Sequence, residues 1–183
     1  YYCQGRVLSE LSASEEALTA YLKAKELVRE TSDRDLEARI NNHLGTLYWK
    51  NGRTEKSLSC YKEAYRNYEM EQNKIGMTNT LRNIGKSMHG LEKLDSAYFY
   101  LDRAFVFAKN ENLESQMAYI LSSMGSIYAE KGLYEKALAY QKESLNYSRI
   151  QNTKSSCYYA IGESYVNIQK LDSALLYVDS ALM

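Results

Sequence analysis

Apolar, glycine and small residues recur along the chain with a period of about 40 residues. Gly45, Gly85, Gly125 and Gly162 are spaced 40, 40 and 37 residues apart, and a further step of 40 back from the first reaches Gly5. Large apolar residues precede the last four glycines: Leu44, Ile84, Met124 and Ile161. Small residues stand twelve and nineteen positions after every glycine: Ala17, Ser57, Ala97, Ala137, Ala174, Ala24, Ala64, Ala104, Ser144 and Ala181. Since small residues let two helices approach closely, the pattern predicts five copies of one packed helical unit.

Each copy predicts two helices joined by a short turn, so the chain is expected to be all-α. The expected helices cover residues 1–11, 14–31, 36–50, 54–72, 75–90, 94–110, 114–131, 134–150, 154–169 and 171–183. Gly52 and Gly132 mark two of the turns, because glycine adopts turn conformations without steric cost. Residues 12–15 fit a capping box at the start of a helix, and Thr54 or Asp172 is expected to cap another.

Composition agrees with a folded helical domain and argues against several functions. The chain of 183 residues has no proline and 9 glycines, so the turn residues of an all-β fold are missing. Lysine plus arginine and aspartate plus glutamate each total 23, so direct contact with nucleic acid is not expected. No apolar run is long enough to span a bilayer, and no membrane contact is expected within the segment. Tyrosine is abundant, at 18 residues, and several tyrosines recur at fixed positions of the repeat.

Candidate catalytic and metal-binding residues are sparse. Cys3, Cys60 and Cys157 form an odd and scattered set without a CxxC pair, and the two histidines, His43 and His89, lie far apart in sequence. These spacings argue against a disulfide framework, a structural zinc site and a nucleophile with its base. We therefore expect no cofactor, no metal and no enzymatic activity. The two later cysteines are expected to be small buried packing residues.

The repeats resemble the tetratricopeptide repeat family, as the segments HLGTLYWKNGRTEKSLSCYKEAY and SMGSIYAEKGLYEKALAYQKESL illustrate. The resemblance implies an α-solenoid, a right-handed superhelix of about five helix-turn-helix repeats. It covers residues 1–183 as a single array. The repeats are expected at about 1–35, 36–75, 76–115, 116–153 and 154–183. The period exceeds the 34 residues of the common form, and the usual proline is missing, so these repeats are of an extended kind.

The two ends of the array lack the polar caps that natural arrays carry. The first repeat starts in the middle of its unit, and the last helix carries Leu175, Leu176, Val178 and Leu182 before Met183. We therefore expect the array to be a fragment of a longer chain. The alternative is self-association through the exposed terminal helices.

The resemblance also implies a binding groove, lined by the first helix of every repeat. In the family, positions 2, 5, 9, 12 and 13 of that helix face the groove, and steps of three or four residues share a helical face. The candidate groove residues are Arg6, Arg39, Asn42, Thr46, Trp49, Lys50, Asn79, Arg82, Lys86, His89, Tyr119, Ser122 and Tyr159.

The first three repeats make this candidate groove basic in a neutral protein. Arginine and lysine side chains can bind carboxylates, an asparagine amide can pair with a peptide backbone, and tryptophan is a frequent anchor at interfaces. These residue types favour an extended or helical peptide with acidic groups. The carboxylate clamp of family members that bind chaperone tails is not matched, so chaperone binding is not predicted. The alternative is that the charges form an ordinary solvated face.

The expected function is therefore a protein- or peptide-binding module. The repeat length and the tyrosine-rich, proline-free style are similar to the sensor regions of bacterial signalling regulators. One alternative is an assembly or secretion scaffold that associates with itself through the ends of the array. Another is a regulatory enzyme subunit, which the lack of a catalytic pair argues against. For location, the alternatives are the cytoplasm and, where a removed leader or anchor preceded the segment, the periplasm.

Overall fold

The computed structural model describes residues 1–148 and 151–182, and within them the backbone is helical and free of strands. The described residues form ten α-helices: α1 (Tyr2–Glu10), α2 (Ser14–Val28), α3 (Arg34–Lys50), α4 (Thr54–Met70), α5 (Lys74–His89), α6 (Leu94–Asn110), α7 (Glu114–Glu130), α8 (Tyr134–Tyr147), α9 (Gln151–Asn167) and α10 (Leu171–Leu182). None of them is both long and apolar enough to cross a membrane. The prediction of an all-α chain built from helix pairs is confirmed.

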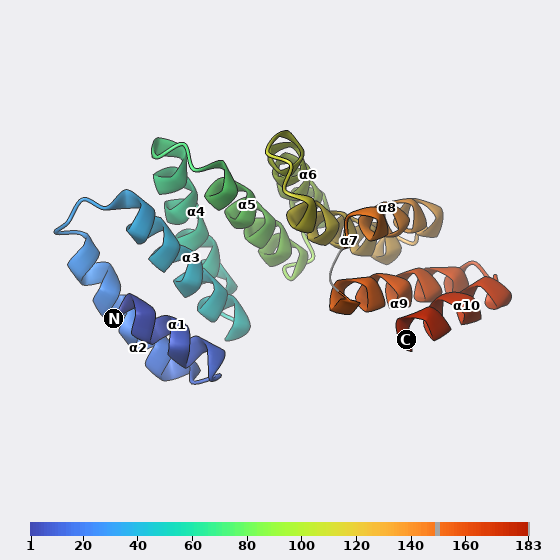
Figure 1. Ribbon diagram of the computed structural model, residues 1–183, viewed down its shortest axis with the longest axis horizontal. Coiled ribbons are helices and arrows are strands. Elements are labelled where there is room, and N and C mark those ends of the chain that lie inside the picture. Colours follow the sequence, from blue (N-terminus) through green and yellow to red (C-terminus); the bar gives the residue numbers. More distant parts are fainter. Residues whose placement is uncertain (149–150, 183) are drawn as a thin grey trace. The chain divides into compact units, whose positions relative to one another are not determined.

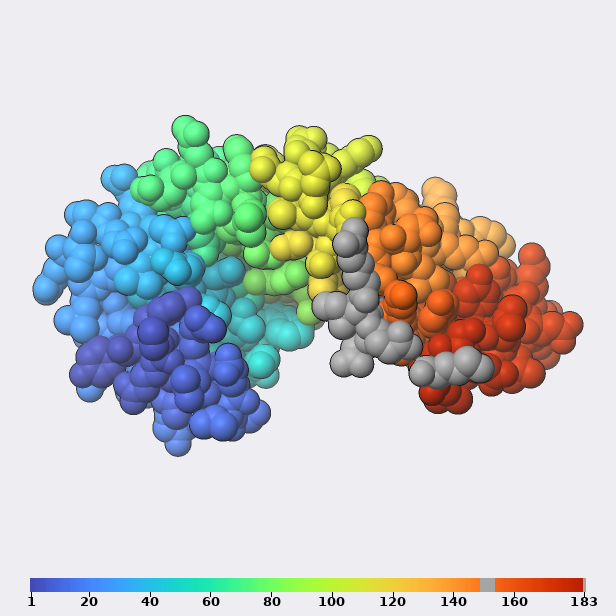
Figure 2. Space-filling view, in the orientation of Figure 1, coloured from blue at the N-terminus to red at the C-terminus, as the bar shows by residue number. Residues whose placement is uncertain are grey.

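The helices belong to two compact units, the N-terminal unit Tyr1–Leu91 and the C-terminal unit Glu92–Met183. In the N-terminal unit, drawn in blue to green in Figure 1, each of the helices α1–α5 packs on the next, and α3 also contacts α5. In the C-terminal unit, drawn in yellow to red, α6–α10 pack in the same order, and α7 also contacts α9. Side chains close the spaces between neighbouring ribbons in each unit (Figure 2). First helices of successive repeats therefore lie side by side within each unit.

Close contact between a glycine and a tyrosine ring holds helix pairs of the N-terminal unit together. A Cβ atom added to Gly45 would lie 2.5 Å from the ring of Tyr61, and one added to Gly5 would lie 2.9 Å from the ring of Tyr21. Both rings are buried. The aromatic partner of each glycine is thus a residue of the second helix, sixteen positions later. The repeating glycine is required because any side chain there would occupy the space of the ring.

The turns between helices share a residue in the left-handed conformation, and in most turns that residue is not glycine. Residues with positive φ recur every 20 positions from residue 12 to residue 132: Ser12, Ser32, Gly52, Gln72, Glu92, Asn112 and Gly132. In several of these turns the backbone N–H of the residue after the left-handed one donates to a carbonyl of the last helical turn, as from Arg53 to Tyr48 at 2.8 Å. This is the Schellman arrangement, which satisfies carbonyls at a helix end. Glycine marks only two of these turns, and the others use residues for which positive φ is strained.

The predicted helix caps at residues 12–15 and at Thr54 are wrong. Helix α2 begins after Ala13 and α4 after Arg53, and neither has a side-chain cap. The observed side-chain caps are Asp33 and Asn73. The Asp33 carboxylate accepts from the Leu36 N–H, and the Asn73 side chain caps the start of α5 in the same way. Ser12 adopts positive φ and lies one position before the N-cap residue Ala13, whereas Thr54 lies one position after the N-cap residue Arg53, inside α4.

Several predicted helix bounds also differ from the observed ones, by up to three residues. Helix α2 ends at Val28 and not at residue 31, because the Thr31 hydroxyl donates to the Val28 carbonyl at 2.8 Å and Ser32 adopts positive φ. Helix α8 ends at Tyr147, and the predicted end at residue 150 lies outside the described residues. Met183, the predicted end of α10, lies outside them as well.

One buried polar side chain occupies a core position of α3. Asn41 is fully buried, and neither atom of its amide has a hydrogen-bond partner among the described residues. Leu81 and Leu121 occupy the same place relative to the glycines of the next two repeats, and both are buried. An unsatisfied amide of this kind destabilises the folded state, because water would hydrogen-bond it in the unfolded chain.

The variant Asn41→Leu is therefore expected to raise the free energy of unfolding by about 1–3 kcal/mol. The two side chains have similar size, so the replacement adds apolar contact without overpacking. Urea denaturation followed by circular dichroism measures the change. The reverse substitution Leu81→Asn is the control and should destabilise the chain. A loss of stability in Asn41→Leu would mean that the amide has a stabilising partner.

Candidate functional site

All thirteen candidate groove residues lie on the first helices of their repeats. Ten belong to the N-terminal unit, where Arg6 lies on α1: the others are Arg39, Asn42, Thr46, Trp49 and Lys50 on α3, and Asn79, Arg82, Lys86 and His89 on α5. Three belong to the C-terminal unit: Tyr119 and Ser122 on α7, and Tyr159 on α9. The two sets therefore belong to different units, and a common groove stays a prediction.

The positive charge of Arg39 is compensated within the N-terminal unit. Its Nε atom lies 3.0 Å from a carboxylate oxygen of Asp35, one turn earlier on α3. The guanidinium also lies over the ring of Tyr2 on α1, 5.8 Å from the ring centroid. Arg39 thus joins α1 to α3 and contributes little net charge to the surface.

An amide pair joins α3 to α5. The Asn83 side chain donates from Nδ2 to Oδ1 of Asn42 at 3.2 Å. The hydroxyl of Thr46 donates to the Asn42 backbone carbonyl at 3.1 Å and lies 3.1 Å from the Tyr61 hydroxyl. Asn83 was missed by the sequence analysis, because no pattern within one helix identifies a partner on the neighbouring helix. Among the described residues, the Asn42 Nδ2 group has no hydrogen-bond partner in addition to this pair.

Lys86, Arg82 and Trp49 form a cationic cluster on an aromatic base, which we call the Trp49 cluster. The Lys86 ammonium lies 5.1 Å from the centroid of the Trp49 ring, a distance suited to a cation–π contact. Partial burial, and then the nearby Arg82 guanidinium, lower the pKa of Lys86. No carboxylate of the described residues pairs with the Lys86 ammonium. Trp49 remains 37% exposed, so the indole is available to a ligand.

The other predicted residues of the N-terminal unit differ in exposure. Arg6 and Lys50 are exposed, whereas Asn79 and His89 are half-buried. In the C-terminal unit, Tyr159 is largely exposed, and the Ser122 backbone carbonyl accepts from the Ser126 hydroxyl at 3.2 Å.

The described histidine and cysteine side chains are not arranged for nucleophilic catalysis. His43 stacks on Tyr21 with a centroid distance of 5.2 Å, and its Nε2 lies 3.5 Å from the Tyr2 hydroxyl. Burial, and then the arginines at 6 and 39, lower the pKa of His43. Cys60 and Cys157 are buried, and burial raises the pKa of the Cys60 thiol. Within residues 1–148 and 151–182, no three His, Cys, Asp or Glu side chains gather as metal ligands do.

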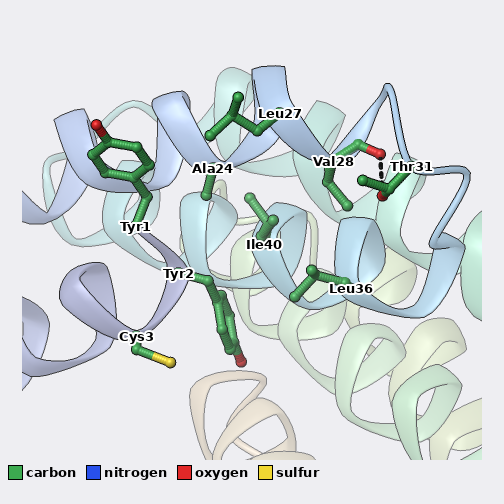
Figure 3. A pocket seen from close by; sticks show the side chains of 9 residues that line it. All are labelled: Tyr1, Tyr2, Cys3, Ala24, Leu27, Val28, Thr31, Leu36 and Ile40. Atoms are coloured by element: carbon green, nitrogen blue, oxygen red, sulfur yellow. Dashed lines mark hydrogen bonds between the residues drawn. The ribbon is translucent and has the colours of Figure 1, made fainter.

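An apolar cavity of about 390 Å³ opens between α1, α2 and α3. Figure 3 shows its lining side chains, which come from the three helices and from Tyr1 and Thr31. Its lining residues are Tyr1, Tyr2, Cys3, Ala24, Leu27, Val28, Thr31, Leu36 and Ile40. The Thr31 hydroxyl is engaged with the Val28 carbonyl, as the dashed line in Figure 3 marks. The cavity can therefore hold apolar groups but offers few polar contacts.

Family models match two parts of the chain. A tetratricopeptide repeat model matches residues 1–70, and a second tetratricopeptide repeat model matches residues 118–150. No curated protein sequence matches the chain. The two matches include α1–α4 and most of α7 and α8, which carry the close contacts of Gly5, Gly45 and Gly125.

Solved structures share the fold at low sequence identity. BtubC from P. vanneervenii has a TM-score of 0.85 and 18% identity, over 97% of this chain and 75% of that one. RapI without ligand has a TM-score of 0.89 and 17% identity, over 99% and 67%. The Rap conjugation gene regulator of the plasmid pLS20, in complex with the Phr* peptide, has a TM-score of 0.84 and 16% identity, over 99% and 51%. The chain thus spans about half to three quarters of these proteins.

Proposed function

Because the chain belongs to the tetratricopeptide repeat family, we propose that it is a peptide-binding module whose ligand is an acidic peptide. The ligand would lie on the first-helix surface of the N-terminal unit. Its carboxylates would pair with Lys86 and Arg82, and its apolar side chains would contact the exposed indole of Trp49. The similarity in fold to a Rap regulator solved with a peptide supports a place in bacterial signalling.

The observation that carries the proposal is the geometry of the Trp49 cluster. The exposed Lys86 ammonium lies over the Trp49 ring, near the half-buried Arg82. Desolvation, and then the Arg82 guanidinium, lower the pKa of Lys86 and so oppose its charge. A carboxylate ligand would relieve both effects, since an opposite charge stabilises the ammonium and supplies hydrogen-bond acceptors. Arg39, by contrast, already has Asp35 as its counter-ion. The expected anion site is therefore smaller than the basic groove that the sequence predicts.

Selection of peptides from a random display library on the 183-residue chain tests this function. The single tryptophan of the chain is Trp49, so its fluorescence reports binding at the cluster. We expect the selected peptides to be rich in aspartate and glutamate and to change the emission of Trp49 in a saturable way. Selected peptides that lack acidic residues, or that leave Trp49 emission unchanged, would overturn the proposal.

A further inference from the structure

A polar cavity of about 410 Å³ lies within the C-terminal unit. The last turns of α7 and α9 and the first half of α8 enclose it. Ser126 and Glu130 come from α7, Tyr134 and Gln141 from α8, and Glu163 and Asn167 from α9. Every lining residue belongs to the C-terminal unit, and none is a member of the Trp49 cluster.

The cavity exists because two large side chains of the N-terminal unit have small counterparts here. Ala129 stands four residues after its glycine, where Trp49 stands in the second repeat. Gln141 stands sixteen residues after the same glycine, where Tyr61 stands in the second repeat. In the N-terminal unit the equivalent corner is occupied by the two aromatic rings and by Lys86 over the indole. Replacing both rings by smaller groups leaves an open volume between the helices.

The charge at this corner is opposite in sign to the charge at the equivalent corner of the N-terminal unit. Glu163 directly follows its glycine, as Lys86 does in the third repeat. The Glu163 side chain is exposed and has no cationic partner among the described residues. The corner that is cationic and filled in the N-terminal unit is therefore anionic and hollow in the C-terminal unit.

Most donors around the cavity are already used inside the protein. The Ser126 hydroxyl donates to the Ser122 carbonyl, and the Ser164 hydroxyl donates to Gln141 Oε1 at 3.0 Å. The Asn167 amide donates to the Glu163 backbone carbonyl at 2.9 Å. The acceptors that remain toward the cavity are the carboxylate oxygens of Glu163, the amide oxygen of Asn167 and hydroxyl lone pairs.

One donor completes the site. Gln141 is 2% exposed, and its Oε1 is engaged by Ser164. Its Nε2 group has no acceptor within residues 1–148 and 151–182 and is not among the fully buried atoms without a partner, so it is accessible from the cavity. A carbonyl of a bound peptide would supply an acceptor there.

We propose that this cavity binds an arginine residue of a peptide. A guanidinium carries five N–H donors in a rigid fork and no acceptor, which matches a carboxylate surrounded by further acceptors. Glu163 receives the guanidinium, and Gln141 donates to the backbone carbonyl of the same arginine. The inference goes beyond the proposed function, because it assigns a second ligand chemistry, of opposite charge, to the other unit.

Titration of the isotope-labelled 183-residue chain with N-acetyl-arginine N-methylamide, followed by NMR, tests the assignment. We expect saturable shifts of the backbone amides of residues 126–130 and 160–167, with millimolar affinity. The citrulline analogue has nearly the same shape without the charge and should not saturate. Shifts elsewhere only, or equal binding of citrulline, would overturn the proposal.

Three variants separate charge from shape. Glu163→Gln should weaken binding about tenfold, because one charge-assisted interaction is lost. Ala129→Trp introduces the residue of the second repeat and should block the cavity without changing any charge. Glu135→Gln removes an exposed carboxylate of α8 outside the cavity and should bind as the parent chain does. Unchanged affinity in Glu163→Gln contradicts the proposal even if Ala129→Trp fails to fold.

Discussion

Reversal of two charges, in the double variant Arg82→Glu with Lys86→Glu, is expected to weaken binding of a selected acidic peptide by at least about 100-fold. Each cation contributes about 1.5–3 kcal/mol when it hydrogen-bonds a ligand carboxylate. The new carboxylates also repel the ligand. Fluorescence titration of Trp49 measures the affinity at fixed ionic strength, since salt screens exposed charges.

The matched control is the double variant Lys62→Glu with Arg66→Glu. These two exposed cations lie four residues apart on α4, the same spacing as the pair on α5. The control therefore produces the same change of net charge on a second helix of the same unit. Its affinity should fall by less than about threefold, the size expected for screened long-range charge effects. Equal losses in the two double variants would show that only net charge matters and would remove the Trp49 cluster as the site.

Addition of a single methyl group, in the variant Gly45→Ala, is expected to destabilise the chain by about 2–3 kcal/mol. The added Cβ would meet three atoms of the Tyr61 ring at 2.5–3.0 Å. The ring is 2% exposed, and its hydroxyl lies 3.1 Å from the Thr46 hydroxyl, so it has little room to move. Helices α3 and α4 must therefore separate. The free energy of unfolding in urea, followed by circular dichroism, measures the loss.

Gly90→Ala is the control for the conformational effect of the same substitution. An added Cβ there would have its nearest contacts at 3.7–3.8 Å, and Gly90 has helical φ and ψ angles. The change should be neutral or stabilising by up to about 1 kcal/mol, because alanine restricts the unfolded chain. A second variant, Gly45→Ala with Tyr61→Leu, should lose less stability than the sum of the two single changes. If Gly45→Ala were as stable as Gly90→Ala, close packing would not explain the repeated glycine.

The helices were predictable because their causes are local or periodic. Glycine and small residues at fixed spacing require close helix packing, and apolar residues at helical spacing require a buried face. The start of α6 and its end were predicted at 94 and 110, as observed. The helix caps were not predictable, because among the described turns the left-handed residue is a glycine only at Gly52 and Gly132. A serine or glutamine in that conformation carries no recognisable signal.

The candidate binding residues were predictable as a helical face but not in their chemistry. Arg39 and Lys86 were both predicted to face the groove, yet one is paired with Asp35 and the other lies on Trp49 beside Arg82. Ion pairs and cation–π contacts depend on side chains from neighbouring helices. No spacing within one helix contains that information.

By itself, then, the sequence determined that the chain is a series of paired helices, because one repeated pattern of glycine, small and apolar residues allows a single mode of packing. Only the tertiary structure decided which charges remain available and where the chain is hollow. The sequence shows Trp49 and Tyr61 in one repeat and Ala129 and Gln141 in another, but it does not show that this difference opens a cavity. A cavity forms only where the side chains of three helices pack together, and that packing is a property of the folded chain.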